Sequence, residues 1–222
     1  MGEGTDHDRG VTVKGRPAAG GGRWVDVAPD RLPRWLENFA VRHGAYRSEG
    51  LTVTAADGAV ARFETPIGAD PVDSVDDLVR TAARPRRLGL LLARKAAVAV
   101  GVADGSRLLA SKVDTHYVQG RTAAGGWSQQ RFARRRANQA KAAAAGGADV
   151  VARVLLPHAD GLAALVTGGD RAAIDAILSA PHLSPLVLVR AARVLEVPEP
   201  RHAVLLAAID QARAVPVLVR DP

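Results

Sequence analysis

The chain has 222 residues, of which 47% are hydrophobic but only 4% aromatic, so it can bury a sizeable core built mainly from Ala, Val and Leu. Its 30 Lys and Arg residues outnumber 23 Asp and Glu residues, and the net charge of +7 favours polyanionic partners such as RNA. The chain has no cysteine, which excludes disulfide bonds, thiolate metal sites and cysteine nucleophiles.

The N-terminal part of the chain divides into two segments. Residues 1–22 are rich in glycine and charge and have no apolar period, so we expect a disordered leader without a signal peptide. Residues 23–84 carry apolar residues at helical and at alternating spacings, which predict a small α+β extension. Its expected elements are a helix from Pro33 to about His43, a hairpin of Leu51–Thr54 and Val60–Phe63, and a helix over Asp73–Ala83.

The pattern changes after the basic segment Arg84–Arg87, and residues 85–222 predict one larger domain. Three successive strands are followed by strands that alternate with helices, so the predicted fold class is α/β, with an α+β-type mixed sheet flanked by helices. The expected strands are Leu88–Ala93, Ala96–Val102, Leu108–Val118, Ala163–Thr167, Leu186–Val189 and Pro216–Val219. The expected helices are Ser128–Ala145, Arg171–Ser179 and His202–Ala212.

No run of this sequence reaches the roughly 18 apolar residues of a membrane span. Two of its apolar runs, Leu88–Ala93 and Ala96–Val102, are separated by Arg94 and Lys95. We therefore expect a cytoplasmic protein that does not contact a membrane.

The most informative segment lies between the third expected strand and the helix that follows it. Gly125 and Gly126 allow positive φ angles and a close approach of the backbone to a ligand. Ser128 is a good N-cap residue, so Gln129 and Gln130 fall in the first helical turn, where backbone N–H groups are free. We predict that these five residues form a catalytic loop. The plain alternative is a flexible crossover loop before a capped helix.

The residues from Gln119 to Lys141 resemble those of a known family. The strings Gly120–Thr122 and Gly125–Gln129, with the Arg-rich helix after them, are similar to the Vms-type release factors of ribosome-associated quality control, in their actinobacterial branch. The same loop resembles the middle domain of eukaryotic and archaeal class-I release factors, which carries a Gly-Gly-Gln sequence. The order of elements is similar from about Leu88 to Val219.

This resemblance implies a release-factor middle-domain fold with an RNase H-like mixed sheet. It also implies a peptidyl-tRNA hydrolase that enters the peptidyl-transferase centre and releases stalled nascent chains, with peptidyl-tRNA and the rRNA of the large ribosomal subunit as partners. The loop departs from Gly-Gly-Gln because Trp127 and Ser128 follow the glycines here. Gln129 fits the Gly-Gly-Ser-Gln order of the Vms-type loop when Trp127 is counted as an insertion, and Gln130 stays open as the alternative.

The loop suits ester hydrolysis without a charged catalytic group. The peptidyl-tRNA ester is activated, so a positioned water and hydrogen bonds to the developing oxyanion can supply much of the rate. A glutamine carbonyl can accept a hydrogen bond from the water, while its NH₂ or a backbone N–H donates to the ester. The ribose hydroxyl of the terminal adenosine can carry the proton, which would account for the lack of an acidic pair.

The expected helix after the loop is strongly basic and has no acidic residue in its predicted span. One side of it combines arginines with Asn138, at spacings that place them on the same face. The predicted RNA-binding residues are Arg121 and Trp127 of the loop and Arg131, Arg134, Arg135, Arg136 and Lys141 of the helix. Trp127 packs in the core, anchors the loop or stacks on an unpaired base of tRNA. A second side, which we expect to lie against the sheet, consists of Ala133, Ala137, Ala140 and Ala144.

Two other functions stay open at this point. The same loop and ribose hydroxyl would support cleavage of the tRNA phosphodiester near its 3′ end, and a non-catalytic RNA-binding module would use the glycines only to recognise shape. The six histidines have no metal-ligand spacing and no phosphate-binding loop is present, so we expect no metal and no cofactor. We expect no stop-codon recognition by residues 23–84, whose role stays open, as does the oligomeric state.

Overall fold

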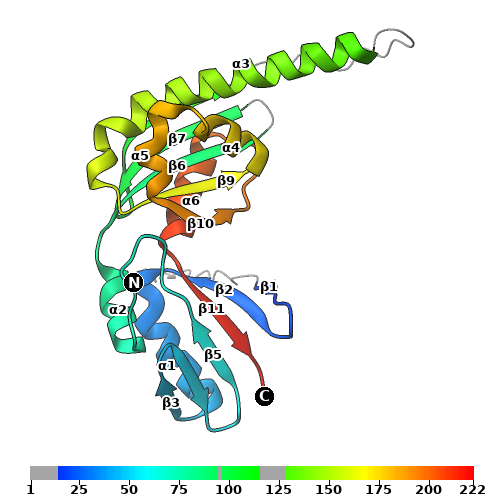
Figure 1. The fold of residues 1–222 in the computed structure, drawn as a ribbon. Helices are drawn as coiled ribbons and strands as arrows, with labels where there is room; N and C mark the ends of the chain where they lie inside the picture. The colour runs from blue at the N-terminus through cyan, green and yellow to red at the C-terminus, as the bar shows by residue number, and fades with distance from the viewer. Residues whose placement is uncertain (1–14, 95–96, 116–128) are drawn as a thin grey trace, which may run out of the picture.

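Two β-sheets, each with its own helices, make up the protein (Figure 1). The computed structural model describes residues 15–94, 97–115 and 129–222, and gives only the backbone of Thr115 and of residues 129–137. The predicted mixed sheet flanked by helices is confirmed, and it is formed by the C-terminal part of the chain. Within the residues that the structure describes, no helix has both the length and the apolar character that a membrane span needs.

The N-terminal sheet is antiparallel throughout, with the strand order β1-β2-β11-β5-β4-β3. Its strands are β1 (Arg16–Pro17), β2 (Arg23–Val27), β3 (Tyr46–Glu49), β4 (Thr52–Ala55), β5 (Val60–Phe63) and β11 (Val215–Arg220). One face packs against α1 (Leu32–His43) and α2 (Val75–Ala83), and a short 3₁₀ helix (Pro29–Arg31) precedes α1. This face is buried because alternate strand residues such as Val53, Phe63 and Val217 are apolar.

The predicted helices and hairpin of residues 23–84 are confirmed. Ser74 begins α2 as its N-cap, since its hydroxyl oxygen accepts the backbone N–H of Asp77 at 3.1 Å. Strand β3 was not predicted, because its residues are all exposed and show no apolar alternation. Arg16–Pro17, which we placed in the leader, pairs with β2, and residues 1–14 lie outside the described residues.

β11 joins the N-terminal sheet although it follows the whole mixed sheet in sequence. It lies between β2 and β5, and its Val215, Val217 and Val219 enter the N-terminal core. The strand predicted at Pro216–Val219 is therefore present, but it pairs outside the sheet in which we expected it. Without β11 the strands β2 and β5 would have no partner on their facing edges.

The mixed sheet has the strand order β10-β9-β6-β7-β8. Its strands are β6 (Arg87–Arg94), β7 (Ala97–Asp104), β8 (Arg107–Thr115), β9 (Ala164–Gly169) and β10 (Arg190–Leu195). The pairs β6–β7 and β7–β8 are antiparallel, whereas β6–β9 and β9–β10 are parallel. One face carries α3 (Gln129–Leu155), α4 (Arg171–Leu178) and α5 (Ser184–Leu188), and the other carries α6 (His202–Arg213). Two 3₁₀ helices, Leu156–Gly161 and Pro181–Leu183, complete the described elements.

Two short connections join the sheets. Arg84–Arg86 link α2 to β6, and Ala214 alone links α6 to β11. The Arg86 guanidinium donates to the backbone carbonyl of Thr81 at 2.9 Å, and Arg193 of β10 forms an ion pair with Asp26 of β2 at 3.2 Å. The N-terminal sheet and the mixed sheet are therefore held together by covalent and by side-chain contacts.

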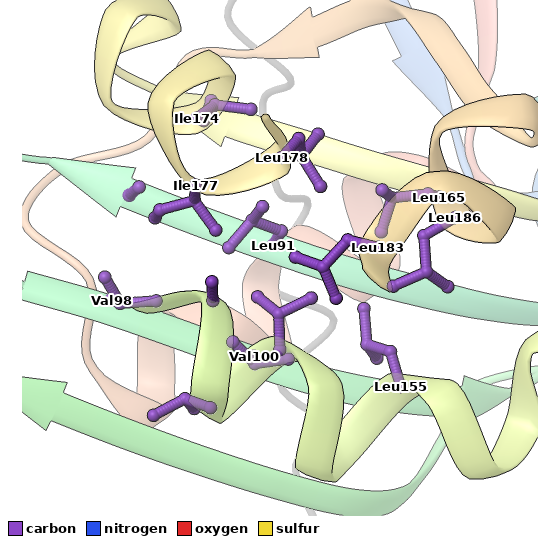
Figure 2. Close-up of a cluster of buried hydrophobic side chains, with 14 of the residues drawn as sticks. Leu91, Val98, Val100, Leu155, Leu165, Ile174, Ile177, Leu178, Leu183 and Leu186 are labelled. Atoms are coloured by element: carbon purple, nitrogen blue, oxygen red, sulfur yellow. The ribbon is translucent and has the colours of Figure 1, made fainter. Parts of the chain in front are cut away.

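The strand predicted at Leu186–Val189 is wrong, because this segment forms α5 and the strand β10 begins only at Arg190. A short apolar run does not distinguish a strand from a buried helical turn. Pro185 suits the first turn of a helix, and Leu186 is fully buried among the residues of the core cluster in Figure 2.

Helix α3 ends ten residues later than we predicted, at Leu155 instead of Ala145. Gly147 is buried where α3 crosses α4 and β7. A Cβ atom added there would lie 2.9 Å from Cγ1 and Cδ1 of Ile177. The glycine therefore allows close helix packing, and α3 continues to Leu155, which fills the core beside Leu183 and Leu186 (Figure 2).

Gly147→Val tests this close packing. We expect it to lower the free energy of unfolding by about 1–3 kcal/mol, because the added methyl groups would displace Ile177 from a well-packed core. Ala145→Val is the matched control, since Ala145 lies two residues away on the exposed side of the same helix. Urea unfolding followed by circular dichroism measures both variants, and equal losses of stability would contradict the packing role.

Candidate functional site

The N-terminal half of α3, residues 129–142, forms an arm that extends beyond the mixed sheet, as Figure 1 shows. Residues 138–142 of this helix are exposed, and its buried positions begin at Gly147 and Ala148. At 1.5 Å per residue, the helix from Gln129 to Gly147 is about 27 Å long. The N-terminal end of α3 is thus held well away from the body of the protein.

The base of the arm is fixed by apolar packing. Val151 and Leu155 of α3 are fully buried, and Ala148 is 3% exposed. They contact the core that β6, β7 and β9 form with α4 and α5 (Figure 2). The buried residues recur at three- and four-residue intervals, so the helix presents one continuous apolar stripe to the sheet over its last third.

The predicted catalytic loop is located by its two flanks. β8 ends at Thr115 and α3 begins at Gln129, so the loop joins the edge strand of the mixed sheet to the outer end of the arm. Gln129 and Gln130 are the first two residues of α3, as the N-cap prediction for Ser128 required. The other predicted loop residues, Arg121, Gly125, Gly126, Trp127 and Ser128, lie outside the described residues.

The predicted basic residues of the helix lie in the N-terminal half of α3. The backbone of α3 includes Arg131, Arg134, Arg135 and Arg136 in its first turns, with no acidic residue in the first turn. Lys141 and Asn138 are exposed. A helix N-terminus carries free N–H groups and a partial positive charge, so this end of α3 is suited to an anionic ligand.

The predicted small-residue side of α3 is only partly correct. Ala144 is partly buried and packs against the core cluster. Ala140 is exposed, because the sheet does not extend that far along the helix. Among the described residues of this side, contact with the core is therefore made by Ala144 and not by Ala140.

The structure also brings together residues that the sequence analysis did not connect. A pocket of about 180 Å³ lies between α1 and the strands β2 and β11. Its lining residues are Arg23, Val25, Trp35, Asn38, Phe39, Arg42, His43 and Val219. The sequence signal was the spacing of Trp35, Asn38 and Arg42, which places them along one side of α1.

Two acidic residues near this pocket are engaged by its own side chains. Arg23 pairs with Asp221 at 2.7 Å, and Nδ1 of His43 lies 2.8 Å from the Asp57 carboxylate. The pKa of Asp57 lies below its ordinary value, first because its carboxylate accepts the backbone N–H of Ala59 and then because of His43. Asp57 therefore stays ionised near neutral pH.

Within residues 15–94, 97–115 and 129–222, no group of three or more His, Cys, Asp or Glu side chains is placed to hold a metal ion.

The comparisons with known proteins concern mainly the mixed-sheet part of the chain. Residues 86–218 match the family described as Actinobacteria/chloroflexi VLRF1 release factor. Among solved structures, the chain is similar to the archaeal translation termination factor aRF1, with 13% sequence identity and a TM-score of 0.41 over 72% of this chain and 50% of that chain. It is also similar to a structure described as an archaeal protein, with 11% identity and a TM-score of 0.39 over 85% and 73% of the two chains.

This chain thus spans half the length of the archaeal termination factor. No curated protein matches it. The family match covers more than half of the chain, includes the predicted loop and the whole of α3, and agrees with the resemblance found in the sequence. The chain therefore belongs to the family of Actinobacteria/chloroflexi VLRF1 release factors.

Proposed function

We propose that this protein is a cytoplasmic peptidyl-tRNA hydrolase that releases nascent chains from stalled large ribosomal subunits. Membership of a release-factor family supports an action on the ribosome and on tRNA. The observation that carries the proposal is the arm of α3, which holds Gln129 about 27 Å from the first buried residue of the helix. A loop at the end of such an arm can reach a reaction centre that the body of the protein is too wide to enter.

In the proposed reaction, water attacks the ester carbonyl that joins the nascent chain to the tRNA. The side-chain carbonyl of Gln129 or Gln130 accepts a hydrogen bond from that water, and an amide N–H of the loop donates to the developing oxyanion. The C–O bond to the ribose then breaks, and the terminal ribose takes up the proton that the water loses. The products are a free peptide carboxylate and an intact tRNA.

The basic arm supplies the binding energy that positions this loop. Arg131, Arg134 and Arg135 are spaced to share one side of α3, and Lys141 extends the charge along the exposed half. Phosphate contacts of this kind bind RNA without reading its sequence, and they release counterions when they form. The affinity for the ribosome should therefore fall steeply as salt rises.

Replacement of the loop glutamines tests the chemistry. We expect Gln129→Ala, or Gln130→Ala if that amide is the active one, to slow release from stalled peptidyl-tRNA by about 10²-fold or more, because the attacking water loses the carbonyl that positions it. Gln139→Ala is the matched control, because Gln139 is exposed on the same helix ten residues further along. Full release activity in the Gln129→Ala, Gln130→Ala double variant would contradict the proposal.

The reaction products separate the proposal from its two alternatives. Hydrolysis leaves an intact tRNA and a free peptide, whereas cleavage of the tRNA phosphodiester leaves the peptide attached to a short 3′ fragment. A non-catalytic binding module would yield neither product. Gel analysis of labelled tRNA and labelled peptide from the same reaction distinguishes these outcomes.

The length of the arm gives a second test. Deletion of residues 137–143 removes about two helical turns and brings the loop about 10 Å closer to the sheet, while the helix faces stay almost unrotated. We expect release to be lost while the unfolding midpoint changes little, since most of these residues are exposed.

Lys141→Ala controls for the charge that this deletion removes. It should lower the affinity for the ribosome but leave release at saturating factor close to that of the unaltered protein. If the deletion variant releases peptide as fast as Lys141→Ala does, the arm has no positioning role.

A further inference from the structure

We propose that the pocket beside Trp35 binds one unpaired nucleotide of RNA, and so forms a second RNA contact outside the loop and arm. It lies in the N-terminal sheet, whose strands β1 to β5 and helices α1 and α2 all precede the family match that begins at residue 86. The choice of RNA as ligand rests on the proposed function. The pocket itself is defined by described side chains alone.

The wall of the pocket is aromatic. The half-buried Trp35 ring stacks on Phe39 with a centroid separation of 5.5 Å and an interplanar angle of 15°, and it meets the edge of Phe63 at 5.6 Å. The His43 ring lies 4.9 Å from Phe39. These contacts fix the Trp35 ring, so its exposed part is a preformed surface on which a base can stack.

The rim of the pocket carries hydrogen-bond donors that have no partner among the side chains that the structure describes. Asn38 and Arg42 are exposed at the edge of the pocket, and neither makes a side-chain hydrogen bond or ion pair with any side chain that the structure describes. Asn38 can recognise the polar edge of a base, and Arg42 can hold a phosphate. The pocket volume of about 180 Å³ is sufficient for one planar base.

The charge around the pocket also favours a nucleotide. Its acidic neighbours are Asp221 and Asp57, and each is already paired, with Arg23 and His43 respectively. The ion pair of Arg23 is largely solvent-exposed, so this arginine can exchange its carboxylate for a phosphate at little cost. Arg42 then adds a positive charge that no carboxylate within the described part of the chain pairs with.

The other hollow beside α1 has a different character. It measures about 500 Å³ and lies between α1 and α2. Its lining includes the carboxylates of Glu37 and Asp76 beside the single cation Arg80. That surface would repel a phosphate, so the two sides of α1 are distinct and the RNA contact is assigned to the side of Trp35 and Arg42.

A single-tryptophan protein tests the pocket directly. The sequence has three tryptophans, so the variant Trp24→Phe, Trp127→Phe keeps Trp35 as the sole reporter. Titration with a single-stranded RNA hexanucleotide should quench its fluorescence to saturation. Because a quenching base must lie close to the ring, binding of RNA to the arm alone would leave the signal unchanged.

Exposed substitutions in the same background locate the contact without disturbing the core. Arg42→Ala should weaken the quenching titration about tenfold, as expected for loss of one charge-assisted hydrogen bond, and should reduce the salt slope by about 0.7. Arg34→Ala is the matched control, because Arg34 is exposed on the same helix but does not line the pocket. Asn38→Asp should weaken binding by repelling the phosphate.

Three results would overturn the assignment. These are the absence of quenching, equal effects of Arg34→Ala and Arg42→Ala, and quenching by polyglutamate at the same concentration as the RNA. The test does not depend on hydrolysis, so a Gln129→Ala, Gln130→Ala protein should show the same quenching. Failure of the pocket and failure of the catalytic proposal are therefore told apart.

Discussion

The packing of the last third of α3 against the mixed sheet is the interaction on which the rest of the structure depends. Val151 and Leu155 are fully buried there, and Gly147 allows the helix to approach Ile177 without a clash. An isolated helix with so little apolar surface is marginal in water, so the exposed half of α3 inherits its direction from this anchored half. The anchor thus sets the direction of a basic, alanine-rich helical extension.

The sequence predicted the elements whose residues satisfy one simple rule. Strands β6 and β7 are long apolar runs, and α2 has an N-cap followed by an amphipathic period, so their positions are confirmed. The strand predicted at Leu186–Val189 was wrong, because its apolar residues suit either a strand or a helical turn. The burial of Leu186 in the core accompanies the helical form, α5. The C-terminal end of α3 was not predicted, because Gly147 lies within the helix only to allow close packing against Ile177, which is 30 residues away in the sequence.

The candidate site likewise combines residues that are contiguous in the sequence with residues that only the fold brings together. The loop was recognised because its residues are contiguous, and the family it resembles is confirmed by the match over residues 86–218. Gln129 and Gln130 as catalytic groups stay predictions. The Trp35 pocket was not predicted, since Arg23 and Arg42 become neighbours only when β2 packs beside α1. The spacing of residues along α1 indicates one wall of that pocket, and the packing of β2 and β11 beside α1 forms the other.

The insertion of β11 between β2 and β5 has a mechanical consequence. The chain passes from the N-terminal sheet to the mixed sheet through Arg84–Arg86 and returns through Ala214. The two parts are therefore joined by two short connections. A single flexible linker would let the parts swing freely, whereas two short links resist rotation. The distance between the N-terminal end of α3 and the Trp35 pocket is consequently set by the fold. The two proposed RNA contacts can therefore form together only on an RNA surface whose two sites lie at that distance.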